Sequence, residues 1–207
     1  MAAWEHVFSA LYDPLLWVGE RAGMAKHRED LLSQASGRVL ELGAGTGLNL
    51  PHYPDVIRDL TLTEPAAPML PKLERRLRKT HREGQVVTAT AEELPFEDDS
   101  FDTVVSTLVL CTVDDPRRAI DETARVLRPG GQLLFLEHVR SDSPRLARWQ
   151  DRLHRPWHAF AAGCHANRAT VDLLRESPLE VDAVESERWS WMPALVHPLA
   201  IGTAQAS

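Results

Sequence analysis

Cysteine is scarce in this chain of 207 residues, where it occurs only at Cys111 and Cys164. Two cysteines so far apart in the sequence provide neither a disulfide scaffold nor the paired Cys-x-x-Cys motifs of a zinc site. A chain without a disulfide scaffold is typical of a reducing compartment. We therefore expect a cytoplasmic protein that uses no metal cofactor.

A long apolar run is also lacking. Residues 1–19 contain acidic side chains in place of a basic leader, and they never sustain the roughly 18 apolar residues that a membrane span requires. We therefore expect no integral membrane segment, and we interpret this stretch as an amphipathic surface helix.

An excess of positive charge is absent as well. The chain has 23 Lys and Arg residues against 30 Asp and Glu residues, for a formal net charge of -7. This balance argues against a broad phosphate-binding face, and we interpret the basic run at residues 72–79 as the solvated face of a helix. Nucleic acid is not expected as a partner, which leaves a small molecule.

Short apolar segments alternate with longer segments of helical period. This alternation predicts a parallel sheet covered by helices on both faces. The expected parallel strands are residues 38–43, 60–65, 85–91, 101–110 and 132–139, and the expected intervening helices are residues 68–81 and 116–127. The "RPGG" at residues 128–131 predicts a turn between the last of these helices and the last of these strands.

The alternation of short apolar segments with helical segments ends after residue 140. Residues 179–191 and 194–206 predict a closing antiparallel hairpin, which gives an α/β, Rossmann-like, seven-stranded and mostly parallel sheet. We expect one domain over residues 1–207, with an N-terminal helical cap at 1–36. Residues 141–178 are expected to form a helical insert that serves as a substrate lid.

Three glycines, Gly43, Gly45 and Gly47, follow the first strand and are expected to precede a helix. In this position they lie at the carboxyl edge of the sheet, where open α/β folds bind ligands. Their spacing is G-x-G-x-G. The dinucleotide fingerprint G-x-G-x-x-G fails because the sixth position is Leu48, and the loop has no Walker lysine, so NAD and nucleoside triphosphates are disfavoured.

Two carboxylates accompany the glycine loop. Glu41 precedes it and can help to position a positively charged amino-acid group, through water or directly. Glu64 follows Gly43 by 21 residues, at the end of the second strand, where a carboxylate can accept hydrogen bonds from both ribose hydroxyls. Two carboxylates without a phosphate cradle indicate S-adenosylmethionine.

At this point the sequence resembles the class I S-adenosylmethionine-dependent methyltransferases. The resemblance rests on "ELGAGTG", "TEPAAPML", "ATAEELPFEDDSFDTVVS" and "ARVLRPGGQLLFLE", which occur in the family's order. It implies that the glycines line the cofactor, that Glu64 binds the ribose and that Met69 packs on the adenine. The cofactor-binding residues taken together are Glu41, Gly43, Ala44, Gly45, Gly47, Glu64, Pro65, Met69, Thr90, Ala91, Glu92 and Thr107.

One of these positions departs from the family pattern. Many relatives have Asp where this chain has Thr90. The amino group of the adenine is therefore expected to bond to backbone or to Glu92.

Segments outside the shared motifs are similar to the methyltransferase-like seven family of alkyl-thiol S-methyltransferases. These segments are "MAKHREDLL", "STLVLCTV", "FLEHV" and the "PWH" and "GCHANR" of residues 156–168. The similarity implies methyl transfer to a small thiol. The chain departs from that family in lacking its hydrophobic N-terminal anchor, so membrane attachment is not expected.

Candidate catalytic residues are His138, after the fifth strand, and His158, in the insert. Either could act as a general base, and either could instead be a structural histidine. Cys111 is interpreted as a small core residue. Two alternatives to thiol methylation stay open: methylation of an oxygen, nitrogen or carbon atom of a small aromatic, quinone or lipid-like acceptor, and a cofactor-binding module without turnover.

Overall fold

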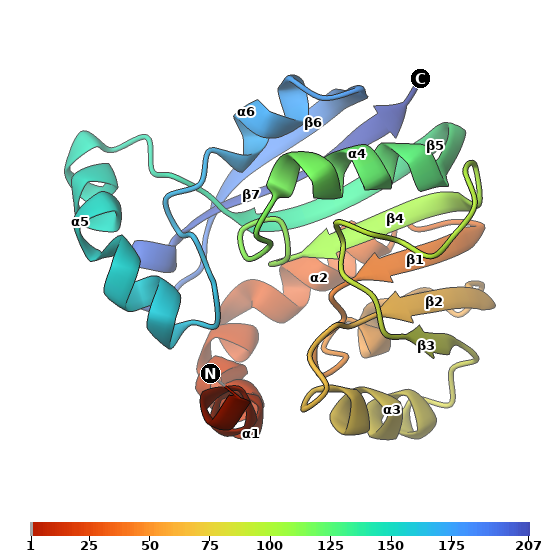
Figure 1. Cartoon of the computed structure of the whole chain (residues 1–207), viewed down its shortest axis with the longest axis horizontal. Helices are drawn as coiled ribbons and strands as arrows, with labels where there is room; N and C mark the ends of the chain where they lie inside the picture. Colours follow the sequence, from red (N-terminus) through yellow and green to blue (C-terminus); the bar gives the residue numbers. More distant parts are fainter. Residues whose placement is uncertain (1) are drawn as a thin grey trace.

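Seven strands form one sheet in the order β3-β2-β1-β4-β5-β7-β6 (Figure 1). The computed structural model describes residues 2–207, with side chains described from residue 6. The strands are β1 (Arg38–Leu42), β2 (Asp59–Thr63), β3 (Gln85–Val87), β4 (Phe101–Thr107), β5 (Leu127–His138), β6 (Leu179–Arg188) and β7 (Pro198–Ala206). Strands β1 to β5 pair in parallel, and β7 is antiparallel to both β5 and β6. The predicted fold class is confirmed.

Helices cover both faces of this sheet. They are α1 (Ala2–Gly19), α2 (Ala25–Leu32), α3 (Leu70–Lys79), α4 (Pro116–Val126), α5 (Pro144–Phe160) and α6 (Thr170–Arg175), with a π-helical turn η1 (Glu20–Met24) and short 3-10 turns η2 (Leu50–His52) and η3 (Ala194–Val196). The start of α4 illustrates the local cause: the Asp115 side chain accepts hydrogen bonds from the backbone N–H groups of Arg117 and Arg118, and Pro116 occupies the first turn.

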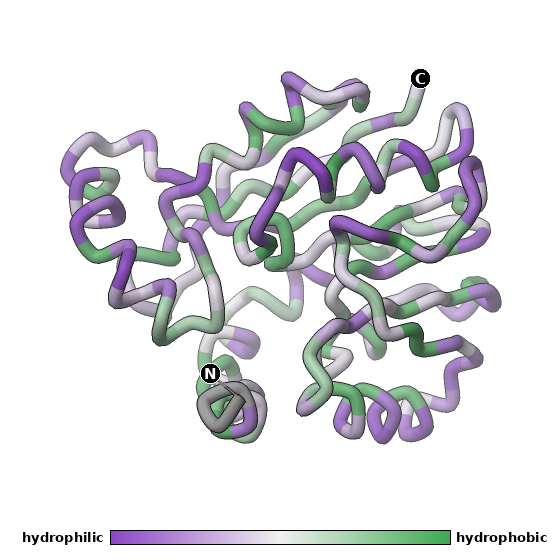
Figure 2. The backbone as a smooth tube through the Cα atoms, viewed as in Figure 1, coloured by the Kyte–Doolittle hydropathy of each residue, from purple (hydrophilic) through white to green (hydrophobic). Residues whose placement is uncertain are grey.

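Alternation along β5 divides the core between the two faces. Phe135 belongs to the apolar cluster under α4 and α6, whereas Leu134 and Leu136 belong to the cluster under α1, α2 and α3. Figure 2 shows the matching pattern, with apolar residues concentrated along the strands and hydrophilic residues on the outer turns of α3 and α4. The two apolar clusters pack on opposite faces of the strands, and the candidate site lies at the carboxyl ends of these strands.

The expected helix after the glycine loop is wrong. The chain forms turns and then only η2, with Pro51 in its first turn. Tyr53 adopts an extended conformation (φ -66°, ψ 142°) before Pro54, because a residue that precedes proline is disfavoured in the helical region. The two prolines therefore restrict this segment to one short turn.

Residues 128–131, predicted as a turn, lie within the bounds of β5. The pairing of β4 with β5 shifts register between Phe101 and Thr103, and Gly130 has a φ of 74°, so the strand is irregular here. Helix α4 nevertheless stops at Val126, ahead of the Arg-Pro-Gly-Gly segment.

The insert expected at residues 141–178 divides into two parts. Helix α5 lies beyond the carboxyl ends of β1, β2 and β4, and α1 flanks the same edge (Figure 1). Helix α6 instead packs on α4 and β6, as part of the cover of the sheet. Among the described residues, no helix has both the length and the apolar character needed to cross a membrane.

Candidate functional site

The glycine loop after β1 depends on three left-handed residues. Gly43, Gly45 and Gly47 have φ values of 49°, 57° and 82°. A Cβ at Gly43 would lie 2.9 Å from Val109 Cγ2, and one at Gly47 would lie 2.7 Å from Leu50 Cδ1. At Gly45 the nearest protein atom would be the Gly43 carbonyl oxygen, at 3.9 Å. Gly43 and Gly47 therefore permit close packing, whereas Gly45 keeps space free beside the loop.

Glu64 is held directly against this loop. Its Oε2 accepts a hydrogen bond from the Gly45 N–H at 2.7 Å, and its Oε1 accepts one from the Ala66 N–H at 2.8 Å. Burial raises the pKa of Glu64, and the two backbone donors oppose that rise. Each oxygen retains acceptor capacity, so the carboxylate can still receive hydroxyl donors.

Glu41 lies in a buried carboxylate network, which we define as Glu20, Arg28, Glu41, Asn49 and Tyr53. Its Oε1 accepts from Asn49 Nδ2 at 3.1 Å, and its Oε2 accepts from the Tyr53 hydroxyl at 2.7 Å. Asn49 Oδ1 accepts from Arg28 Nη1 at 2.7 Å, and Arg28 pairs with Glu20 at 3.0 Å. Burial raises the pKa of Glu41 to about 7, while Tyr53, Arg28 and Asn49 lower it. Both oxygens of Glu41 are thus already bonded within the protein.

Other predicted cofactor residues surround the same loop. The Ala44 N–H donates to the Thr63 carbonyl at 2.8 Å, and Thr107 Oγ1 accepts from Asn49 Nδ2 at 3.0 Å. Met69 is buried at the start of α3, and Pro65 is exposed. These positions place the ends of β2 and β4 beside the glycine loop.

The Thr90 to Glu92 turn lies farther along the same edge. The Glu93 N–H donates to the Thr90 carbonyl at 3.4 Å, and Ala91 is buried. Glu92 Oε1 accepts from the backbone N–H of Asp114 at 3.0 Å. The Glu92 carboxylate therefore links this turn to the segment before α4.

Helix α1 contacts the loop through residues that sequence reasoning missed. Asp13 accepts from Thr46 Oγ1 at 2.6 Å and pairs with Arg76 at 2.8 Å, while Arg76 also donates to the Thr46 carbonyl at 2.8 Å. Asp13, Asn49 and Tyr53 belong to none of the motifs quoted above, and Arg28 lies in the "MAKHREDLL" segment without a role that the segment assigns. Only their proximity in the folded chain identifies them.

His138 lies in a second buried group, the cysteine–histidine cluster, which we define as Cys111, His138 and Cys164. The distance from His138 Nδ1 is 3.6 Å to Cys111 Sγ and 3.5 Å to Cys164 Sγ. The His138 ring stacks on Trp189, with centroids 5.5 Å apart and an interplanar angle of 21°. The interaction with Cys164 and burial raise the pKa of Cys111, and the interaction with Cys111 lowers the pKa of Cys164. Cys111 is thus buried as expected, yet it also contacts a candidate catalytic residue.

Backbone contacts fix this cluster. The Glu137 carboxylate accepts from the N–H groups of Val109, Leu110 and Cys111, each at 3.0 Å. The His165 N–H donates to the Cys111 carbonyl at 2.7 Å. The segment after β4, the end of β5 and the loop after α5 are therefore held together at one point.

His158 belongs to a different group from His138. Its ring centroid is 4.6 Å from that of His165 and 5.8 Å from that of His154. His154 Nε2 lies 2.7 Å from His165 Nδ1, and burial lowers the pKa of His165 to about 4. The two predicted catalytic histidines are thus separated between two clusters.

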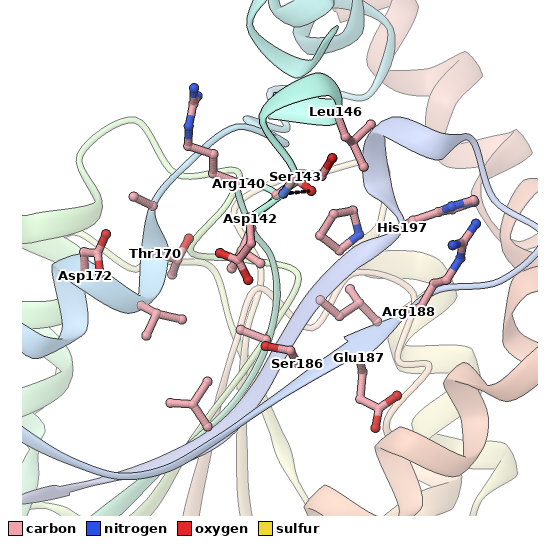
Figure 3. Close-up of a pocket in the computed structure, with 18 of the residues that line it drawn as sticks. Arg140, Asp142, Ser143, Leu146, Thr170, Asp172, Ser186, Glu187, Arg188 and His197 are labelled. Carbon is pink, nitrogen blue, oxygen red and sulfur yellow. Dashed lines mark hydrogen bonds between the residues drawn. The ribbon is translucent and has the colours of Figure 1, made fainter. Parts of the chain in front are cut away.

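A groove of about 790 Å³ opens elsewhere, beside the starts of α5 and α6 and along β6 and β7. Figure 3 shows polar side chains on its walls, including Arg140 and Asp142 on one side and Glu187, Arg188 and His197 on another. None of the predicted cofactor or catalytic residues lines it. The groove is therefore separate from the predicted cofactor residues around the glycine loop.

Comparisons with known proteins identify the family of this chain. A family model described as a methyltransferase domain matches residues 40–135. The thiol S-methyltransferase TMT1B of Homo sapiens is 36% identical over 194 residues, which cover 84% of this chain and 77% of that protein. The human thiol S-methyltransferase TMT1A is 34% identical over 200 residues, which cover 87% of this chain and 79% of that protein.

Two further comparisons concern an N-methyltransferase and a solved structure. The phosphatidylethanolamine N-methyltransferase of Cereibacter sphaeroides is 35% identical over 147 residues, covering 70% of this chain and 71% of that protein. A solved methyltransferase structure from Thermotoga maritima aligns over the whole of both chains with a TM-score of 0.75 and 24% identity, which shows a shared fold. The chain belongs to the class I S-adenosylmethionine-dependent methyltransferases, and within them to the type of the TMT1 thiol S-methyltransferases.

Proposed function

We propose that this protein transfers the methyl group of S-adenosylmethionine to the sulfur of a small thiol. The single observation that carries the choice of sulfur is the similarity to the two human thiol S-methyltransferases, which extends over more than four fifths of this chain. The proposed compartment is the cytoplasm, which the lack of paired cysteine motifs supports.

The proposed cofactor site is the loop of Gly43, Gly45 and Gly47 together with Glu64. The open space beside Gly45 fits a ligand that approaches the backbone closely, and Glu64 offers acceptor positions to a ribose. S-adenosylmethionine supplies an electrophilic methyl group on its sulfonium sulfur when bound. Glu41 accepts a hydrogen bond from Asn49, which lies two residues after Gly47, so we assign Glu41 a positioning role through Asn49.

The proposed acceptor side is the edge formed by the ends of β4 and β5 and by α5. Trp157 is partly buried against the cysteine–histidine cluster and offers an apolar wall, and His158 offers a polar group on the same helix. Holding the acceptor close to the methyl donor and excluding water are the two contributions that these residues would make. Thiol acceptors place a low demand on a base, because a thiol of pKa about 8.5 already supplies some thiolate at neutral pH.

An acceptor panel tests the proposal. The purified protein is incubated with methyl-labelled S-adenosylmethionine and with alkyl thiols, phenols and amines in parallel, and S-adenosylhomocysteine binding is measured by calorimetry. We expect labelled thioether from alkyl thiols. Product from phenols or amines alone would overturn the choice of sulfur, and binding without any product would favour a module without turnover.

A second candidate is methylation of an amine on a lipid headgroup. The similarity to the Cereibacter sphaeroides phosphatidylethanolamine N-methyltransferase favours it, over 70% of this chain. Vesicles that contain phosphatidylethanolamine belong in the same panel. Labelled methylated lipid without labelled thioether would replace the first proposal by the second.

A further inference from the structure

Three potential metal ligands meet where sequence spacing gave no metal motif. Cys111 follows β4, His138 ends β5, and Cys164 lies in the loop after α5. Their ligand atoms all lie within 4.8 Å of one another, and all three residues are buried. No other such group of three or more histidine, cysteine or acidic residues occurs among the residues that the structure describes.

The distances fit a shared metal ion as well as they fit hydrogen bonds to sulfur. Zinc–sulfur bonds of about 2.3 Å and zinc–nitrogen bonds of about 2.0 to 2.1 Å, at a tetrahedral angle, place sulfur and nitrogen about 3.6 Å apart. The observed separations from His138 Nδ1 are 3.6 Å to Cys111 Sγ and 3.5 Å to Cys164 Sγ. A ring nitrogen has one lone pair or one proton, so it can hydrogen-bond fully with only one of two thiols. A shared ion would satisfy all three atoms.

The donor set also selects the kind of ion. Thiolate and imidazole ligands suit zinc and copper(I), whereas magnesium and calcium require oxygen ligands. The site is already organised, because Glu137 holds the backbone of Cys111, and the His165 N–H bonds to the Cys111 carbonyl. Binding would therefore require little rearrangement of the chain.

We propose that Cys111, His138 and Cys164 bind one Zn²⁺ ion. Three protein ligands leave the fourth tetrahedral position to a molecule from outside the chain, which is the arrangement of catalytic rather than structural zinc sites. The cluster adjoins the proposed cofactor site, since the Val109 side chain lies 2.9 Å from the position that a Cβ at Gly43 would take, and Val109 lies two residues before Cys111. If the proposed thiol methylation holds, the acceptor thiolate is the natural fourth ligand, and this part of the inference rests on that function.

The second nitrogen of His138 limits the expected affinity. A metal-bound histidine usually donates its other N–H to a carboxylate, carbonyl or water, and loss of that partner typically weakens binding by about 10- to 100-fold. His138 Nε2 has no hydrogen-bond partner within the described chain. We therefore expect the ion to be removable by a strong chelator without unfolding the protein.

Metal titration tests the site independently of enzyme activity. Reduced, chelator-treated protein is titrated with Zn²⁺, with elemental analysis for stoichiometry, and with Co²⁺, whose thiolate charge-transfer absorption reports cysteine ligands. We expect one equivalent in the parent protein and at least a tenfold loss of affinity in Cys111→Ser, Cys164→Ser and His138→Ala. The matched control is His154→Ala, from the other histidine group, which should bind like the parent.

Retained S-adenosylhomocysteine affinity in Cys164→Ser would show that the loss of metal does not reflect unfolding. The inference is overturned if reduced protein binds no ion, if the cysteine variants bind as well as the parent, or if only His154→Ala loses binding. A Cys111–Cys164 disulfide in place of metal binding under reducing conditions would overturn it as well.

The fourth position is tested with the cobalt form. An alkyl thiol that the protein methylates should change the cobalt spectrum when added with S-adenosylhomocysteine. An unchanged spectrum with a thiol that is methylated would overturn acceptor coordination. Absence of any thioether product would instead overturn the proposed function. The metal stoichiometry would still test the zinc site, because it does not depend on activity.

Discussion

The two buried polar groups at this sheet edge differ in how completely they are hydrogen-bonded. In the carboxylate network on the β1 side, both oxygens of Glu41 and both ends of the Asn49 amide have partners. Four buried side-chain atoms lack a partner within the described residues, and all belong to the later part of the chain: His138 Nε2, Trp157 Nε1, Thr170 Oγ1 and Trp189 Nε1.

Two of these four residues contact the cysteine–histidine cluster, and His138 is one of its members. Trp157 packs against the apolar cluster that contains both cysteines, and Trp189 stacks on the His138 ring. An unbonded buried polar atom costs about 1 to 3 kcal/mol, so each such atom is a place where a water, an ion or a ligand would form a favourable bond. We therefore call the β1 side, beside the proposed cofactor loop, the finished side, because its polar groups are bonded within the protein. We call the β5 side the incomplete side, because it has polar atoms without a partner among the described residues.

Gly45→Val is expected to have the largest effect, because the new side chain would occupy the free space beside the loop and would also strain a left-handed backbone. We expect S-adenosylhomocysteine binding to weaken by at least about 4 kcal/mol, or about 1000-fold. Calorimetry measures this. Gly130→Val is the matched control: its φ is 74° and no atom lies within 4 Å of the new Cβ, so it carries the same strain away from the site. Equal losses in both variants would assign the effect to strain.

Glu64→Ala comes next. It removes the acceptor of the proposed ribose bonds and leaves the Gly45 and Ala66 N–H groups without their carboxylate. We expect cofactor affinity to fall by about 2 to 4 kcal/mol, since a hydrogen bond to a charged group contributes about 1.5 to 3 kcal/mol and neighbouring bonds are not additive. Glu83→Ala, an exposed glutamate, should leave affinity unchanged. Unaltered affinity in Glu64→Ala would remove Glu64 from the site.

Glu41→Gln should alter the pH dependence of stability. Burial raises the folded-state pKa of Glu41 from 4.5 to about 7, so the folded protein keeps a proton that the unfolded chain releases. Stability from this group is full below about pH 4.5 and is lost as pH rises to about 7, by up to about 3 kcal/mol. Glu41→Gln stays neutral and should lack this loss. Denaturant unfolding at pH 5 and pH 8 measures the difference, and parallel profiles for the two proteins would contradict it.

Tyr53→Phe should lower the free energy of unfolding by about 2 kcal/mol at pH 8. The substitution leaves Oε2 of a buried, charged Glu41 without its hydroxyl donor. In a protein that already carries Glu41→Gln, Tyr53→Phe should lower the free energy of unfolding by less. A double-mutant cycle from unfolding measurements isolates this coupling. Additive effects of the two substitutions would show that the Tyr53 bond does not support Glu41.

A pair of nearly isosteric threonine substitutions gives the smallest effect and the sharpest contrast. Thr63 and Thr170 are both fully buried, but the Thr63 hydroxyl donates to the Glu41 carbonyl, whereas Thr170 Oγ1 has no partner in the described chain. Thr63→Val should cost about 1 kcal/mol, and Thr170→Val should be neutral or slightly stabilising. Chemical unfolding of the two variants compares them. Equal costs would end the distinction between a finished and an incomplete side.

Sequence reasoning captured the features that local pattern controls. The apolar run that contains Val104 and Val105 predicted a buried parallel strand, and the order of the motifs placed Gly45 and Glu64 at one edge. It failed after the glycine loop, where Pro51 and the residue before Pro54 prevent a helix.

The contacts of the two buried groups could not be read from the sequence. Cys111 and Cys164 lie 27 and 26 residues from His138, in three separate segments, and only the packed sheet brings them together. Arg28 reaches Asn49 because α2 packs beside η2. Pairings of this kind are set by tertiary packing, which neither spacing nor periodicity encodes.

The order of the strands has a consequence for how the chain is made. Strand β7 lies between β5 and β6, although β6 precedes it in the sequence. Until residues 198–206 have been synthesised, β6 has no partner strand, and β5 presents an open apolar edge that can pair with another chain. A polypeptide truncated before Pro198 would therefore lose two strands from its sheet.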